Sequence, residues 1–143
     1  MSQHEVTLLL GSNVGNTENN IKTAIRLLEA KIGTIIARTE MITTEPVEFD
    51  SNNFFCNIAI VIKTQYSPIS LLKQLKAVER LMGRSTDTSV SKIYEDRIID
   101  IDVIFFDKIS FYSTELIIPH EKHLHQREFS RRLLDELMNI KKQ

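Results

Sequence analysis

The segment 96–106, which reads DRIIDIDVIFF, constrains the fold of this chain more than any other. Ile, Val and Phe dominate it, and both of its faces are apolar, which is typical of a central strand of a sheet. Side chains alternate along a strand, so five of them are expected on one face: Ile98, Asp100, Asp102, Ile104 and Phe106. The Cα atoms of the two aspartates would then lie roughly 6–7 Å apart in an otherwise apolar row.

Two unpaired carboxylates in an apolar row are costly, because each loses hydration and the like charges repel each other. A bound divalent cation removes both penalties, since oxygen ligands suit Mg²⁺. The alternative is a solvent-exposed face on which Asp100 and Asp102 are merely solvated, because antiparallel sheets often have one wet face. The strand alone favours neither interpretation.

The composition is that of an ordinary globular protein, with 42% apolar and 26% charged residues among 143. We expect one domain over residues 1–143, long enough to bury a core. The net charge of −1 gives no overall attraction to nucleic acid or to a membrane, so an anionic ligand needs a local cluster of basic residues.

The single cysteine, Cys56, lies in an apolar run and is interpreted as a buried core residue of a protein in a reducing compartment. The start of the sequence does not have the features of a signal peptide, and no apolar stretch is long enough to span a membrane. We therefore expect a cytoplasmic location.

Hydrophobic periodicity predicts a β-α-β-β-α-β order with a helical tail. The expected strands are 6–10, 34–43, 54–64 and 96–106, with a short one near 116–118, and the expected helices are 17–32, 67–83 and the segment beginning near 129. This order predicts an α+β, ferredoxin-like antiparallel sheet with helices packed on it. Two polar loops, 45–53 and 84–96, are either lids over a site or plain connections.

The sequence resembles the 6-hydroxymethyl-7,8-dihydropterin pyrophosphokinases, a family of folate biosynthesis. The matching motifs span nearly the whole chain in order: Gly11-Ser12-Asn13-Val14-Gly15, Thr44-Glu45-Pro46, Phe55-Cys56-Asn57, Glu79 with Gly83-Arg84, Tyr94 to Asp102, Pro119-His120 and Arg127-Glu128-Phe129. The pattern Arg-x-x-Asp-x-Asp is the most specific of them. The resemblance implies a ferredoxin-like fold and transfer of the β,γ-diphosphate of ATP onto the hydroxymethyl oxygen of the pterin, which leaves AMP.

The resemblance also implies the catalytic residues, namely Arg84, Arg97, Asp100 and Asp102. The two aspartates match the ligands of two Mg²⁺ ions, and the arginines match groups that contact phosphate. This set suits diphosphoryl transfer, which depends on positioning and on neutralising charge. The alternative for Arg97 is an ion pair with Asp96 or Asp100, although arginine is the usual bidentate phosphate ligand.

Further positions match the substrate sites of the family. Those for the pterin are Thr44, Val47, Phe55, Asn57 and Phe129, and those for ATP are Glu79, Tyr94, Arg97, Val103, Ile117, His120 and Arg127. Phe129 is otherwise a core aromatic, and Glu79 is otherwise a solvated helix residue. A zinc site at His120, His123 and His125 is disfavoured, because their spacing matches no known ligand pattern.

The sequence departs from the family mainly around the phosphates. The 84–96 loop is poor in arginine, with Lys92 as the only other cation, and Glu115 and Glu121 stand where the family has other residue types. Two rival interpretations follow: a ferredoxin-like ligand-binding or regulatory domain without catalysis, and a degenerate paralogue. The expected partners are small-molecule substrates only, without nucleic acid or membrane, and we expect a monomer, with a dimer as the alternative.

Overall fold

A computed structural model of the chain describes residues 3–44, 54–83, 98–120 and 128–141. Its main sheet is antiparallel and contains β1 (His4–Ser12), β2 (Gly33–Arg38), β4 (Phe55–Thr64) and β5 (Asp100–Phe106) in the order β2-β4-β1-β5. A fifth strand, β3 (Ile42–Thr44), pairs with the first residues of β4. The two strands β6 (Phe111–Tyr112) and β7 (Ile117–Ile118) form a separate small sheet.

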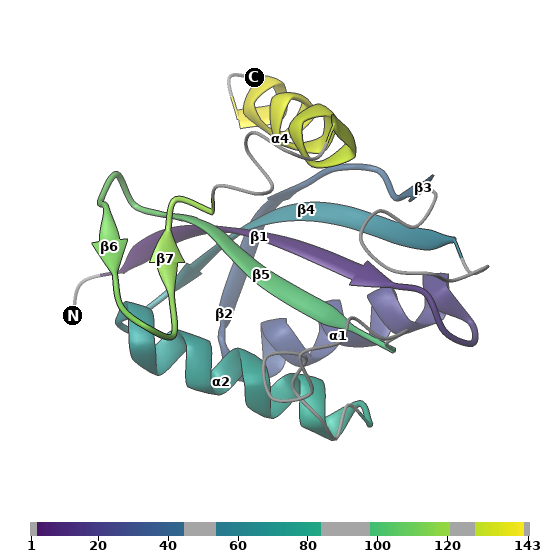
Figure 1. Cartoon of the computed structure of the whole chain (residues 1–143), viewed down its shortest axis with the longest axis horizontal. Helices are drawn as coiled ribbons and strands as arrows, with labels where there is room; N and C mark the ends of the chain where they lie inside the picture. Colours follow the sequence, from purple (N-terminus) through teal and green to yellow (C-terminus); the bar gives the residue numbers. More distant parts are fainter. Residues whose placement is uncertain (1–2, 45–53, 84–97, 121–127, 142–143) are drawn as a thin grey trace.

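The helices α1 (Thr17–Lys31), α2 (Pro68–Leu81) and α4 (Glu128–Lys141) cover the main sheet on both faces. In Figure 1, α1 and α2 lie on one face and α4 lies on the other. The helix starts follow local sequence signals: the Asn16 side chain accepts a hydrogen bond from the Asn19 N–H at 3.1 Å, and Pro68 begins α2. The predicted β-α-β-β-α-β order and the ferredoxin-like fold are confirmed.

Two apolar cores fill the space between the sheet and the helices. The larger core lies between the sheet and the pair α1 and α2, and the smaller one lies under α4. Strand β4 serves both, because its alternate residues enter opposite cores: Cys56, Ile58, Ile60 and Ile62 enter the larger, and Ala59 and Val61 the smaller. Phe54, the first residue of the predicted strand 54–64, precedes β4 and is exposed.

The prediction that the Asp-containing strand is central was wrong. Strand β5 pairs with β1 alone and is the outermost of the described strands on its side of the sheet. Its apolar pattern has another cause, which is that one face of the strand lies against the larger core and the other against the core under α4. An edge strand covered on both faces has the same sequence pattern as a central one.

The five side chains predicted to share a face of this strand do not all do so. The pairing of β5 with β1 shifts between Thr7 and Leu8, so Ile104 is an extra residue in a β-bulge. Beyond the bulge the alternation reverses, and Phe106 enters the larger core together with Val103. Ile98 lies in a bend before the strand begins.

The segment 34–43, predicted as one strand, is divided into β2 and β3. The interruption is at Thr39. In a regular strand the Ala59 N–H would donate to a main-chain carbonyl group, but here it donates to the Thr39 hydroxyl at 3.1 Å, so the side chain replaces the main chain in the pairing with β4. Among the described residues, no helix has the length and apolar character needed to cross a membrane.

Candidate active site

Three residues on neighbouring strands form a row near one end of the sheet. Gly11 of β1 is the cross-strand partner of Asn57 on β4 and of Asp100 on β5. In the next row on the same face, Leu9 is the partner of Ala59 and of Asp102. Cross-strand partners project to the same side of a sheet, so Asn57, Asp100 and Asp102 share one face. The two aspartates were predicted to share a face, and this is confirmed.

This face is the one that α4 covers farther along. Leu9 and Ala59, which belong to the row of Asp102, pack in the core under α4. The helix itself contacts β2 and β4. The row of Asn57, Gly11 and Asp100 lies one step farther from that core, where polar side chains replace apolar ones. The site is therefore built on the edge of the smaller core.

Because Gly11 has no side chain, the side chain of Asn57 can extend over β1 at this position. A Cβ atom at Gly11 would lie 2.9 Å from Oδ1 of Asn57 and 3.5 Å from Cδ1 of Phe55, so both side chains extend over the glycine. Asn57 is only 4% exposed, and it also pairs with Ile42 of β3 on its other side. The first strand was predicted to end at residue 10, whereas β1 continues to Ser12, and the register of these additional residues was needed to find the contact.

Thr44 and Phe55 lie at the same end of the sheet as Asn57. They are cross-strand partners of β3 and β4, two residues along the chain from the pair Ile42 and Asn57. Three of the predicted pterin-site residues, Thr44, Phe55 and Asn57, are thereby brought together. Phe129 lies in the first turn of α4, but its side chain is outside the described part of the structure.

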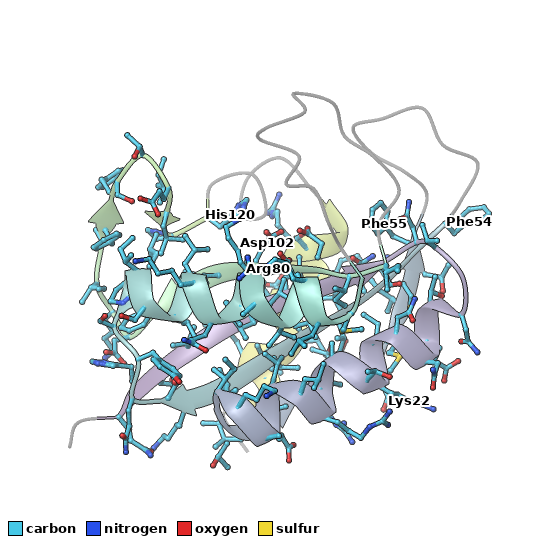
Figure 2. The ribbon with its side chains drawn as sticks, turned by 90° about the horizontal axis from the view of Figure 1, so that it is seen from below. Lys22, Phe54, Phe55, Arg80, Asp102 and His120 are labelled. Carbon is cyan, nitrogen blue, oxygen red and sulfur yellow. The ribbon has the colours of Figure 1, made fainter. Side chains whose placement is uncertain are left out.

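The outer edge of β5 is capped by groups from other elements. The carboxylate Oε2 of Glu79, on α2, accepts a hydrogen bond from the Ile101 N–H at 2.8 Å. Farther along the same strand, the carbonyl group of Ile104 accepts a hydrogen bond from the His120 N–H at 3.1 Å. In Figure 2 the labelled side chain of Phe55, near the start of β4, lies well apart from those of Asp102 and His120.

The remaining predicted nucleotide residues differ in placement. Glu79 is buried, so the alternative of a solvated helix residue is wrong. Val103 is buried in the larger core, on the face of β5 opposite to the aspartates, which leaves only its main chain for a nucleotide contact. Ile117 is exposed on β7. Five predicted residues lie outside the described residues: Val47, Arg84, Tyr94, Arg97 and Arg127.

The donor set of the site fits Mg²⁺. Among the described residues, no three or more His, Cys, Asp and Glu side chains gather as a metal cluster. Asp100 and Asp102 are therefore a two-carboxylate set, and Mg²⁺ commonly takes one or two protein carboxylates, with waters and substrate phosphates as its other ligands. His123 and His125 lie outside the described residues, so the zinc alternative is untested.

Two other titratable groups do not face this site. Burial raises the pKa of the Cys56 thiol, with a smaller contribution from Glu18, as expected for a core cysteine. Beyond the other end of β5, a hydrogen bond from the Glu5 N–H holds the pKa of Asp107 below its usual range, and a hydrogen bond with His4 adds to the effect.

Comparison with known proteins assigns the chain to a family. A family profile described as 7,8-dihydro-6-hydroxymethylpterin-pyrophosphokinase (HPPK) matches residues 7–139. The chain belongs to this family. The resemblance seen in the sequence motifs is thereby confirmed, and the site described above is the part of this HPPK-family chain in which Gly11, Asn57, Asp100 and Asp102 of those motifs lie on neighbouring strands.

The similar proteins include both short and long chains. A 2-amino-4-hydroxy-6-hydroxymethyldihydropteridine pyrophosphokinase of Porphyromonas gingivalis is 33% identical over 135 residues, which cover 92% of this chain and 89% of that one. A mitochondrial folate synthesis bifunctional protein of Arabidopsis thaliana is 37% identical over 128 residues, 90% of this chain. The match spans only 22% of the Arabidopsis protein.

Solved structures show the same fold. A Plasmodium falciparum HPPK-DHPS variant, crystallised with pterin and p-hydroxybenzoate, matches with a TM-score of 0.75 over 95% of this chain and 40% of its own. The two sequences are 18% identical, so this similarity concerns the fold alone.

Proposed function

We propose that this chain transfers diphosphate from ATP to the hydroxymethyl group of 6-hydroxymethyl-7,8-dihydropterin, a step of folate biosynthesis that leaves AMP. The observation that carries the proposal is the row of Asn57, Gly11 and Asp100, with Asp102 beside it, on one face of the sheet. It joins a side chain that can read a flat heterocycle to a pair of carboxylates that suits a metal–phosphate complex. Membership of the HPPK family supports the same reaction.

In this reaction the hydroxymethyl oxygen forms a bond to the β-phosphorus of ATP. The bond between the β-phosphorus and the oxygen shared with the α-phosphate breaks, AMP leaves with the electron pair, and the hydroxyl proton passes to solvent. Asp100 and Asp102 are the residues that would hold two Mg²⁺ ions. When bound, such ions neutralise the phosphate charge and lower the pKa of the attacking hydroxyl group.

Asn57 is the residue that would orient the pterin. Its side-chain amide offers one acceptor and two donors, which suits the amide edge of a pterin ring. Because the side chain is buried and packed against Gly11, its direction is restricted before the substrate arrives. Phe55 and Phe129 are proposed to stack on the ring, and the main chain from Thr44 to Val47 to read its edge.

The remaining residues are proposed to bind ATP. Arg84 and Arg97 would contact the phosphates, and the other proposed contacts are Glu79, Tyr94, the main chain of Val103, Ile117, His120 and Arg127. Positively charged groups near the phosphates stabilise charge in the transition state as well as in the complex. The 84–96 loop contributes few such groups, because Arg84 and Lys92 are its only cationic residues.

The decisive experiment mixes the protein with ATP, Mg²⁺ and the dihydropterin and measures AMP and diphosphopterin. The Asp102→Ala variant should lose turnover and keep its fold, whereas the matched variant Asp107→Ala should stay active because Asp107 follows the other end of the strand. The proposal would be refuted by a folded wild type that forms no AMP, or by an Asp102→Ala variant with normal turnover.

The same arginine-poor loop favours a second candidate, a ligand-binding or regulatory domain without catalysis. This candidate predicts nucleotide binding that is independent of Mg²⁺, and calorimetric titration with α,β-methylene ATP, with and without Mg²⁺, separates the two. A monomeric state and a cytoplasmic location accompany the proposed enzyme as predictions, to be measured by sedimentation and by cell fractionation.

A further inference from the structure

A buried carboxylate lies next to the candidate metal site and is directed at its main chain. Glu79 is 6% exposed, near the end of α2, and glutamate is rarely buried to this extent without a partner. Its Oε2 accepts a hydrogen bond from the Ile101 N–H at 2.8 Å. Ile101 is the residue between Asp100 and Asp102, so the carboxylate contacts the backbone at the midpoint of the aspartate pair.

The position of β5 in the sheet explains why this contact matters. Along a strand, successive N–H groups point alternately to its two sides, and those on an outer side have no neighbouring strand to accept their hydrogen bonds. Within the described part of the chain, β5 is the outermost strand, and the Ile101 N–H points outward, toward α2. The Glu79 carboxylate takes the place that a carbonyl group of a further strand would have.

A charged acceptor makes this hydrogen bond stronger than an ordinary one between main-chain groups. It also links two elements that are 22 residues apart in the sequence. The aspartate side chains themselves project to the face of the sheet that carries α4, whereas Glu79 reaches the strand from α2, on the other face. The carboxylate of Glu79 therefore approaches the backbone of the pair and leaves the face of the aspartates open.

We propose that Glu79 is a positioning residue for the metal site, which acts by holding the Ile101 amide and so fixes the directions in which Asp100 and Asp102 project. This inference rests on the proposed function, which assigns Mg²⁺ to the two aspartates. Metal affinity depends on ligands being held close to their bound geometry, and partners that hold the ligands contribute to it. Glu79 thereby couples the last turn of α2 to the site.

A direct contact between Glu79 and the nucleotide, implied by the family resemblance, makes a different prediction. Loss of a direct contact weakens nucleotide binding both with and without Mg²⁺. Loss of a positioning contact weakens only the additional binding that Mg²⁺ provides, because the nucleotide itself does not touch the missing group. The two roles are therefore separated by the Mg²⁺ dependence of binding.

The test uses three variants of the full chain. Glu79→Gln removes the charge and keeps an acceptor oxygen at the same reach, whereas Glu79→Leu removes the acceptor. The matched control is Glu136→Leu, because Glu136, on α4, also accepts a main-chain hydrogen bond, from the Glu40 N–H at 3.4 Å, and neither residue belongs to β5 or α2. Should Glu79→Leu not fold, Glu79→Asp replaces it, since it keeps the charge and shortens the side chain by one methylene.

The first measurement is hydrogen exchange of the Ile101 amide by NMR, without any ligand. We expect exchange to be about tenfold faster in Glu79→Leu or Glu79→Asp and close to wild type in the other variants. The second is calorimetric titration with α,β-methylene ATP, with and without Mg²⁺. The increase in affinity that Mg²⁺ gives should fall about tenfold in Glu79→Leu or Glu79→Asp and should be largely restored in Glu79→Gln.

The inference would be overturned if the Ile101 amide exchanged at the wild-type rate in Glu79→Leu or Glu79→Asp. It would also be overturned if that exchange became faster while Mg²⁺ still increased nucleotide affinity as much as in the wild type. Equal losses of affinity with and without Mg²⁺ would overturn it in favour of a direct nucleotide contact. Failure of the proposed function has a different signature: the wild type itself would show no effect of Mg²⁺ on nucleotide binding.

Discussion

Replacing Gly11 by alanine is expected to weaken pterin binding without disturbing the nucleotide. The added Cβ would lie 2.9 Å from Oδ1 of Asn57, and ordinary van der Waals contacts of such atoms begin near 3.4 Å. The Asn57 oxygen must therefore retreat by about 0.5 Å, which is the tolerance within which binding groups have to be held. The nearest atom of Phe55 would lie at 3.5 Å, so its ring can stay in place.

The size of the effect follows from the hydrogen bonds at risk. A net hydrogen bond contributes about 0.5–1.5 kcal/mol, and two from the Asn57 amide to the pterin edge would together contribute about 1–3 kcal/mol. Weakening them in part should raise the dissociation constant about tenfold, which corresponds to about 1.4 kcal/mol. Fold stability should change little, because alanine is better suited to a strand than glycine by roughly 0.5–1 kcal/mol, and this offsets strain at the new contact.

The assay is a fluorescence titration with 6-hydroxymethylpterin, which is itself fluorescent, in the presence of α,β-methylene ATP and Mg²⁺. The internal control is the affinity of Gly11→Ala for that nucleotide, which should equal the wild-type value within about twofold. In an Asn57→Ala background the same change at Gly11 should raise the melting temperature, since the oxygen that it meets is gone. Wild-type pterin affinity in Gly11→Ala, alongside a clear loss in Asn57→Ala, would refute the reasoning.

Three further changes test the rest of the fold. The pKa of Asp107 is lowered in the folded state, so its ionised form adds stability above the unfolded pKa of about 3.9 and loses this effect as the pH falls toward the folded value. The melting temperature of the wild type should thus fall more steeply below pH 4 than that of Asp107→Asn, and parallel curves would contradict the assignment. In urea unfolding, Leu133→Ala should lower the free energy of unfolding by about 2–5 kcal/mol, because Leu133 is fully buried between α4 and the sheet. Met138 lies on the same helix and is 55% exposed, so Met138→Ala should lower it by less than about 0.5 kcal/mol. Equal losses would be inconsistent with the packing of α4. Asn16→Ala should cost about 1 kcal/mol through loss of the α1 cap, and an unchanged unfolding midpoint would show that water replaces the cap.

The sequence predicts the parts of this fold that depend on local periodicity. The alternation in β4, with Cys56, Ile58 and Ile60 on one face and Ala59 and Val61 on the other, is visible in the sequence because both faces of that strand are buried. The ends of the helices follow from Asn16, Pro68 and the left-handed Gly83 for the same reason. These signals act over a few residues, so the tertiary structure does not override them.

The position of β5 in the sheet is not visible in its sequence. An edge strand whose two faces both lie against apolar cores has the same apolar pattern as one with two neighbouring strands, and only its edge differs. Its edge is satisfied by Glu79 and His120, which lie far from it in the sequence. The bulge at Ile104 is also hidden, because isoleucine is as suitable for a regular strand as for this one.

Part of the candidate site was predicted, and part needed the register. The family motifs identify Asn57, Asp100 and Asp102, and the sheet brings them onto one face. The role of Gly11 between them depends on which residues are cross-strand partners, and this follows from the pairing of whole strands. Arg84, Arg97 and Arg127 lie outside the described residues, so their contacts with phosphate stay predictions.

The bulge at Ile104 has a consequence for how this strand tolerates mutation. Before it, odd-numbered residues such as Ile101 and Val103 face the larger core, and after it the even-numbered Phe106 does so. If Ile104 were lost, Val103 and Phe105 would be consecutive and would pair with Leu8 and Thr7 in regular register, so Phe106 would keep its partner Val6 and its place in the larger core. The bulge therefore accommodates one extra residue without changing the register on either side of it, and a deletion at this point would remove the Ile104 side chain from the core under α4 while the aspartates and Phe106 kept their partners on β1.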